Sequence, residues 1–283
     1  MFHALLLATL LAPTPTQDAV QDFASYWYSG KAEISRYELT QSRYGAEHPG
    51  HAVLVFVTED FLPQVQVKAD SSDRSQTGAW PILKLNFTKK FATGLYPYSI
   101  MTSVFTPIDV RKHPRTLKTT TSVQEWCGHT FLQLNWRDPH YQVRGFSYFQ
   151  SEGDSDSKLD GAWLEDEIWT RIRIAPETLP TGKLLMIRGS EHIRLRHTPI
   201  AAVSVAATKT KRDNGTYSYR LVEEGKRTLD IVFAGEFPHR IEGWTEEIPH
   251  RGVTKAVRTH TIQSPYWNHN RPADRPLRAR LGL

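Results

Sequence analysis

The chain has 283 residues, of which 39% are hydrophobic, and it contains eight Trp, eleven Tyr and twelve Phe. This length and composition exclude a chain that is disordered throughout, and the aromatic content favours strands around a buried core over a helical bundle. The formal net charge is +5, and four Arg and one Asp within residues 269–283 supply +3 of it. The body therefore carries only +2, which argues against a nucleic-acid-binding protein.

The chain begins with an apolar run from Ala4 to Ala12 that is followed by small residues and prolines. This layout is typical of a secretory signal peptide, and the run is too short to span a bilayer. We therefore predict a signal peptide over residues 1–17 and export to the periplasm or the extracellular space. A single cysteine, Cys127, cannot form an internal disulfide, so the core must hold the exported domain together.

After a short helix or turn that Gly30 ends, the chain reads as a series of strands. Residues 51–59 contain a continuous apolar run, which is typical of a strand that is covered on both faces. Residues 83–91 alternate Leu83, Leu85 and Phe87 with polar side chains, which is typical of a half-buried strand.

The second half continues with alternating segments at 192–197, 215–224 and 227–233. Asn214-Gly215 predicts a tight type I′ hairpin turn, so strands that follow one another should also pair. We therefore expect a mainly β fold, an antiparallel meander that forms a curved sheet or half-barrel with one or two short helices. It should occupy residues 18–268, with a possible internal boundary in the polar loop 151–161.

One helix is predicted over residues 161–174, with Asp160 as its cap and Pro176 as its terminator. Its three carboxylates, Glu165 to Glu167, lie at its start, where the helix dipole favours negative charge. We expect these carboxylates to face solvent.

The candidate chemistry lies around Cys127. If residues 123–131 form one strand, Glu125, Cys127 and His129 share a face, although alternate side chains are about 7 Å apart. We expect Cys127 to be a small buried side chain of the sheet. The alternative is a catalytic thiol with His129 as base and Glu125 as an assisting acid. A metal would need two further ligands, and we expect neither a metal nor a cofactor.

The strands carry more aromatic and β-branched residues than one covered face requires. This surplus favours a hydrophobic or amphipathic ligand, such as a lipid, bound between the curved sheet and the helix at 161–174. The candidate ligand-binding residues are Trp126, Tyr96, Tyr98, His239 and Trp244. A thiol-dependent enzyme and a structural or interaction module are the alternatives.

The basic segment 269–283 is expected to be a flexible tail. Its arginines also allow peripheral contact with a membrane surface or an anionic polymer.

Five blocks of sequence carry a resemblance to a known family: residues 26–45, 50–61, 81–103, 124–130 and 179–183. Together they resemble a family of uncharacterised exported proteins and lipoproteins of Bacteroidota-like bacteria. The resemblance implies export but assigns no activity to any residue. Members sometimes bear the label of the septum-formation inhibitor Maf, whose Ser-x-Ser-Pro-Arg-Arg motif this chain lacks. The pattern of strands with one amphipathic helix also resembles periplasmic lipid-carrier half-barrels.

Overall fold

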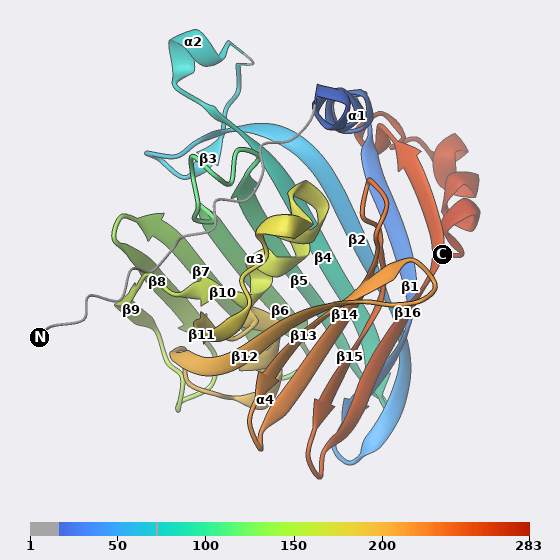
Figure 1. Cartoon of the computed structure of the whole chain (residues 1–283). Coiled ribbons are helices and arrows are strands. Elements are labelled where there is room, and N and C mark those ends of the chain that lie inside the picture. The colour runs from blue at the N-terminus through green and yellow to red at the C-terminus, as the bar shows by residue number, and fades with distance from the viewer. Residues whose placement is uncertain (1–16, 72) are drawn as a thin grey trace, which may run out of the picture.

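A computed structural model describes residues 17–71 and 73–283, so the predicted signal peptide lies outside the described residues except for Gln17. One sheet of 16 strands dominates the fold (Figure 1). Its strands are β1 (Ala32–Arg43), β2 (Ala46–Leu62), β3 (Val67–Lys68), β4 (Trp80–Thr93), β5 (Tyr96–Pro107), β6 (Lys118–Glu125), β7 (Gly128–Arg137), β8 (His140–Ser147), β9 (Ser155–Asp160), β10 (Trp163–Leu164), β11 (Gly182–Ile187), β12 (Ala202–Lys211), β13 (Thr216–Glu223), β14 (Arg227–Ala234), β15 (Ile241–Ile248) and β16 (Gly252–Ser264). The predicted mainly β meander is confirmed.

The path of the chain runs from the middle of the sheet to one edge and then returns from the other edge. The chain starts in the middle of the sheet at β1, proceeds strand by strand to the edge strand β9, and then crosses to the opposite edge at β10. It returns through β11 to β16, which pairs with β1. Neighbouring strands are antiparallel except for the short parallel pair β10 and β11. The segment 151–161, predicted as a polar loop and a possible boundary, contains edge strand β9 at residues 155–160 and directly precedes the crossing to the opposite edge of the same sheet.

Four α-helices lie within residues 17–71 and 73–283, rather than the one or two that were expected. They are α1 (Gln17–Trp27), α2 (Arg74–Thr77), α3 (Glu165–Ile174) and α4 (Ser190–Arg196). Helix α4 replaces the strand predicted at 192–197. The prediction was wrong because an alternation of six residues is too short to separate a strand from one helical turn. None of the described helices has the length and apolar character needed to cross a membrane.

Helix α3 lies inside the curve of the sheet (Figure 1). It begins at Glu165, later than predicted, because Trp163 and Leu164 pair with β11 as strand β10. Ile168, Trp169 and Ile172 join the main core with side chains of both halves of the sheet. The expectation that the first carboxylates of the helix face solvent was wrong, since all three are buried where the sheet surrounds the helix start.

Two further sequence-based expectations differ from the structure. The hairpin at Asn214-Gly215 forms, but only Gly215 has a positive φ, at 80°, whereas a type I′ turn needs two such residues. The segment 269–283, expected to be a flexible tail, contains the 3-10 helix η3 (Pro272–Leu281), and η2 (Tyr266–Asn268) lies just before it. Leu281 is buried in an apolar cluster with Ala32 and Ile34, so this segment packs against the sheet.

Candidate functional site

Three consecutive residues at the start of α4 are held from three sides. Ser190 Oγ donates a hydrogen bond to Asp166 Oδ2 of α3 at 2.5 Å. Lys89 Nζ of β4 donates to Glu191 Oε1 at 2.7 Å. His192 Nδ1 lies 2.7 Å from Glu246 Oε1 of β15. These contacts fix the position of α4 relative to α3 and to both halves of the sheet.

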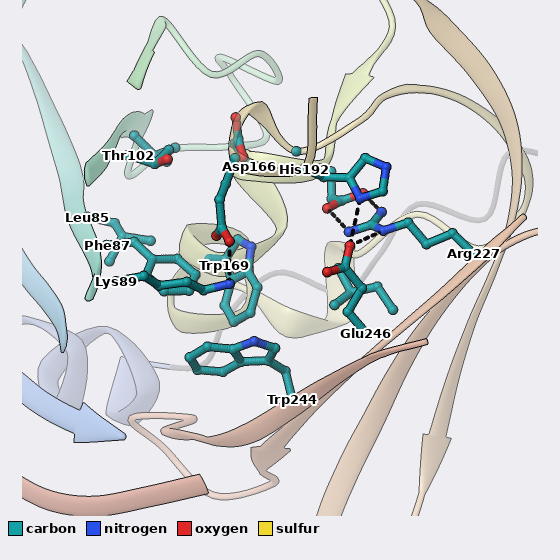
Figure 2. A pocket seen from close by; sticks show the side chains of 15 residues that line it. Leu85, Phe87, Lys89, Thr102, Asp166, Trp169, His192, Arg227, Trp244 and Glu246 are labelled. Carbon is teal, nitrogen blue, oxygen red and sulfur yellow. Dashed lines mark hydrogen bonds and ion pairs between the residues drawn. The ribbon is translucent and has the colours of Figure 1, made fainter. Parts of the chain in front are cut away.

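Glu246, the partner of His192, also belongs to a buried network of charges, which Figure 2 shows. Arg227 forms two hydrogen bonds with Glu165, at 2.5 and 2.8 Å, and a third with Glu246 at 2.5 Å. Burial alone would lower the pKa of Arg227, but Glu165 and Glu246 outweigh burial and hold it above its usual value. Burial alone would raise the pKa of Glu246, but Arg227 and His192 hold it well below its usual value. The network is thus a set of ion pairs that satisfy one another.

Little empty space remains beside this network. The hollow between the charges and the rings of Trp169 and Trp244 has a volume of about 40 Å³, room for a few water molecules and too small for a lipid. The interior between α3 and the sheet, where the sequence predicted an apolar ligand, is therefore filled with side chains here.

Asp166 differs from the other buried carboxylates because, within residues 17–71 and 73–283, no cation pairs with it and its partner is Ser190. Burial raises the pKa of Asp166 to about 7, although the hydrogen bonds from Ser190 act in the opposite direction and Glu165 adds to the rise. The link between α3 and α4 therefore changes its charge near neutral pH.

A larger apolar hollow lies where the two edges of the sheet approach each other. It has a volume of about 330 Å³, which is within the range of small-molecule sites. We call it the seam groove; it runs between β7, β8 and α4, and its lining includes Thr130, Leu132, Gly145, Ile193, Arg194 and Ile200. Leu132, Ile193 and Ile200 belong to an apolar cluster that joins β7 and β8 to β10, β11 and α4 across the open seam. Side-chain packing thus holds the two edges together at the seam.

The polar part of the seam groove is built around Arg194, whose side chain is only 8% exposed. Its Nη1 donates to Glu152 Oε2, and His197 Nδ1 lies 2.6 Å from Glu152 Oε1. Burial alone would raise the pKa of Glu152, but the contacts with His197 and Arg194 outweigh burial and lower it. Glu125 Oε1 lies 3.6 Å from Arg194 Nη2. The groove thus combines apolar walls with one buried cation.

The three residues of the predicted catalytic set do not lie on one strand. Strand β6 ends at Glu125 and β7 begins at Gly128, so Trp126 and Cys127 form the turn between them. Cys127 is exposed, and the prediction that it is buried in a strand was wrong. A side chain at Gly128 would lie 2.7 Å from the ring of Tyr148, so this close approach suits the turn to glycine.

The side chain that makes hydrogen bonds with this turn is Tyr96 and not His129. The Tyr96 hydroxyl donates to Glu125 Oε2 at 2.9 Å and accepts the backbone N–H of Cys127 at 2.9 Å. Burial raises the pKa of Tyr96, and the side chain of Cys127 adds to the rise, while the backbone N–H of Cys127 acts in the opposite direction. No hydrogen bond joins Cys127 to His129 in the part of the chain that the structure describes, so the proposed thiol and base are not assembled.

The five predicted ligand-binding residues separate into three places. Tyr96 contacts both Tyr98 and Trp126, with ring centroids 5.2 and 6.1 Å apart. Trp244 lies in the core against Trp169, beside the charged network. His239 lies in the turn between β14 and β15 and lines neither hollow. The groove residues Leu132, Ile193, Arg194 and Ile200 were missed, because nothing in the sequence shows that β7 and α4 meet.

A third hollow, of about 890 Å³, lies near the turn between β7 and β8. Arg115 and Arg137 line it and donate to backbone carbonyls of Gly161 and Gln64, while Trp80 and Trp136 form part of its wall. It is wide and cationic, in contrast to the seam groove. Within residues 17–71 and 73–283, no group of three His, Cys, Asp or Glu side chains is placed to hold a metal ion.

The chain matches no family model and no curated protein. Among solved structures, it is similar to a beta-barrel-like protein of the domain of unknown function DUF1849 from Brucella abortus. The TM-score is 0.48 and the identity 10%, and the match covers 82% of this chain and 97% of the other. It is also similar to a DUF1089 family protein from Pseudomonas aeruginosa, with a TM-score of 0.33, 14% identity, and coverage of 59% of this chain and 84% of the other. These likenesses are to proteins of uncharacterised families, and no sequence family is identified for this chain.

Proposed function

We propose that this protein binds a hydrophobic or amphipathic small molecule in the seam groove. The observation that carries the proposal is an apolar hollow of about 330 Å³ at the open edge of the sheet, whereas the interior beside α3 is filled with side chains. Leu132, Ile193 and Ile200 offer it an apolar wall, and apolar walls with a few polar groups are typical of small-molecule sites. The site thus lies beside α4 and not between the sheet and α3.

The seam itself favours a site that a ligand can enter. The edges meet through side chains such as Leu134, Leu164 and Ile193. Separating side chains breaks no ladder of backbone hydrogen bonds, so local opening should need less free energy here than elsewhere in the sheet.

Filling the seam groove with a larger side chain should strongly weaken ligand binding. We expect Leu132→Trp to place an indole in the hollow and to weaken binding of the uncharged fluorescent probe N-phenyl-1-naphthylamine at least about tenfold. Leu185→Trp is the matched control, since it makes the same substitution on β11 at a side chain that is 64% exposed and lines none of the three hollows. Equal probe binding by both variants, measured by fluorescence titration, would contradict the proposed site.

We also propose that the protein acts outside the cytoplasm. The apolar run from Ala4 to Ala12 supports this proposal. Amino-terminal sequencing of the protein from its host's envelope fraction should find a start after that run, and an intact Met1 there would contradict cleavage.

Contact with a lipid surface is proposed for the end of the sheet at which α4 lies. Exposed Tyr44, Leu95 and Trp126 occupy the turns between β1 and β2, β4 and β5, and β6 and β7, and the strand register places these turns at the same end. Exposed Tyr and Trp side chains suit the interface between lipid and water. These turns replace the C-terminal segment as the proposed contact.

Replacing two of these exposed apolar side chains should weaken attachment to lipid. We expect Leu95→Ser together with Trp126→Ser to reduce co-sedimentation with phosphatidylcholine and phosphatidylglycerol vesicles several-fold. The pair Arg275→Ser and Arg278→Ser in η3 tests the earlier expectation, and a loss with this pair alone would favour the basic segment instead.

A further inference from the structure

We infer that the ligand of the seam groove presents an uncharged acceptor, the carbonyl oxygen of an ester or amide, to Arg194. This inference rests on the proposed function and names the class of molecule that the same groove takes.

Arg194 has donors that the protein leaves unused. Its Nη1 donates to Glu152, but among the residues that the structure describes neither Nε nor Nη2 has a hydrogen-bond acceptor, although the side chain is more than nine-tenths buried. The N–H bonds of Nε and Nη2 lie on one edge of the guanidinium and can point to one oxygen or to two neighbouring ones. Glu125 Oε1 lies 3.6 Å from Nη2, too far for a hydrogen bond, and since buried donors rarely remain unpaired, this edge suits an acceptor from outside the chain.

The surrounding charges decide what kind of acceptor fits. Arg194 already faces two carboxylates, Glu152 and Glu125, and the side chain of Glu125 is only 9% exposed. A ligand carboxylate or phosphate would meet both of these negative groups at short range in a poorly solvated place. A carbonyl oxygen accepts the free N–H bonds without adding charge, so an uncharged head is favoured over an anionic one.

The apolar wall of the groove indicates what the remainder of the ligand should be. Ile193 precedes Arg194 on α4, and Leu132 and Ile200 pack in the same cluster. An acyl chain along these side chains would place the carbonyl of its ester beside Arg194. Acyl esters and amides thus combine both features that the groove requires.

Three probes of similar length test this class: methyl decanoate, undecane and decanoate. We expect the full-length protein to bind methyl decanoate about tenfold more tightly than undecane, and decanoate at pH 8 more weakly than the ester. The carbonyl infrared band of bound methyl decanoate should move to lower frequency than in an alkane solvent. We expect Arg194→Met to remove both the preference and the band shift while undecane binding persists.

Arg196→Met is the matched control, because Arg196 lies on the same helix and donates to Ser42 O instead. Its binding should equal that of the unaltered protein. Equal affinity for ester and undecane in the unaltered protein, or an unshifted band, would overturn the inference and leave the proposed function intact. Absence of binding for all three probes would overturn both. Tighter binding of decanoate would show an anion site in place of a carbonyl site.

Discussion

Replacing Arg173 by Met is expected to lower the free energy of unfolding by about 3–5 kcal/mol. Arg173 of α3 donates to both oxygens of Glu33 on β1, at 2.6 and 2.7 Å, and both side chains are about 1% exposed. Burial alone would raise the pKa of Glu33, but Arg173 outweighs burial and lowers it. Without Arg173, the Glu33 carboxylate would stay in the core with much weaker compensation.

The guanidinium also contributes by packing. Its carbon Cζ lies 5.0 Å from the ring centroid of Trp27 and 4.6 Å from that of Phe56, so Met retains apolar contact but loses the cation. Urea unfolding followed by tryptophan fluorescence measures the change. Arg144→Met removes an exposed pair with Asp156 and should cost less than about 1 kcal/mol. Equal losses in the two variants would show that the Arg173 pair adds nothing to the core.

The strands could be predicted from the sequence because their pattern is local. Leu83, Leu85 and Phe87 alternate with polar residues, and the structure places all three in the core from strand β4. The chain crossing follows Asp160 at the end of β9, and the mainly polar segment 151–161 was a local sign of its position.

The candidate site could not be predicted because it depends on contacts between distant segments. Glu165 looked like a solvated carboxylate at a helix start, but its partner Arg227 lies 62 residues away on β14. The wall of the seam groove joins Leu132 to Ile193, which no local periodicity connects. Cys127 was misplaced for a related reason, since an alternating segment of nine residues contains a turn at Trp126 and Cys127 that only its pairing partner reveals.

The other large effect expected is on the pH dependence of stability, through Asp166. Its pKa is 3.8 in a model peptide and about 7 in the folded protein, so between these values the folded state keeps a proton that the unfolded state has released. The unfolded state binds fewer protons in this window, and stability therefore falls as pH rises through it and levels off above about pH 7. Between pH 5 and pH 8 the folded state keeps this extra proton over about two pH units, so the free energy of unfolding falls by roughly 3 kcal/mol.

Asp166→Asn should remove this fall, because the amide keeps an acceptor for Ser190 and does not titrate. The free energy of unfolding of Asp166→Asn relative to the unaltered protein should thus rise by roughly 3 kcal/mol between pH 5 and pH 8. Burial lowers the pKa of His51 and His239, which acts in the opposite direction near pH 6, but both proteins share these groups and the difference cancels them. Asp156→Asn makes the same change at an exposed position and controls for the substitution. A constant difference between Asp166→Asn and the unaltered protein, in urea titrations at four pH values, would show that Asp166 ionises in the folded state as readily as in the unfolded one.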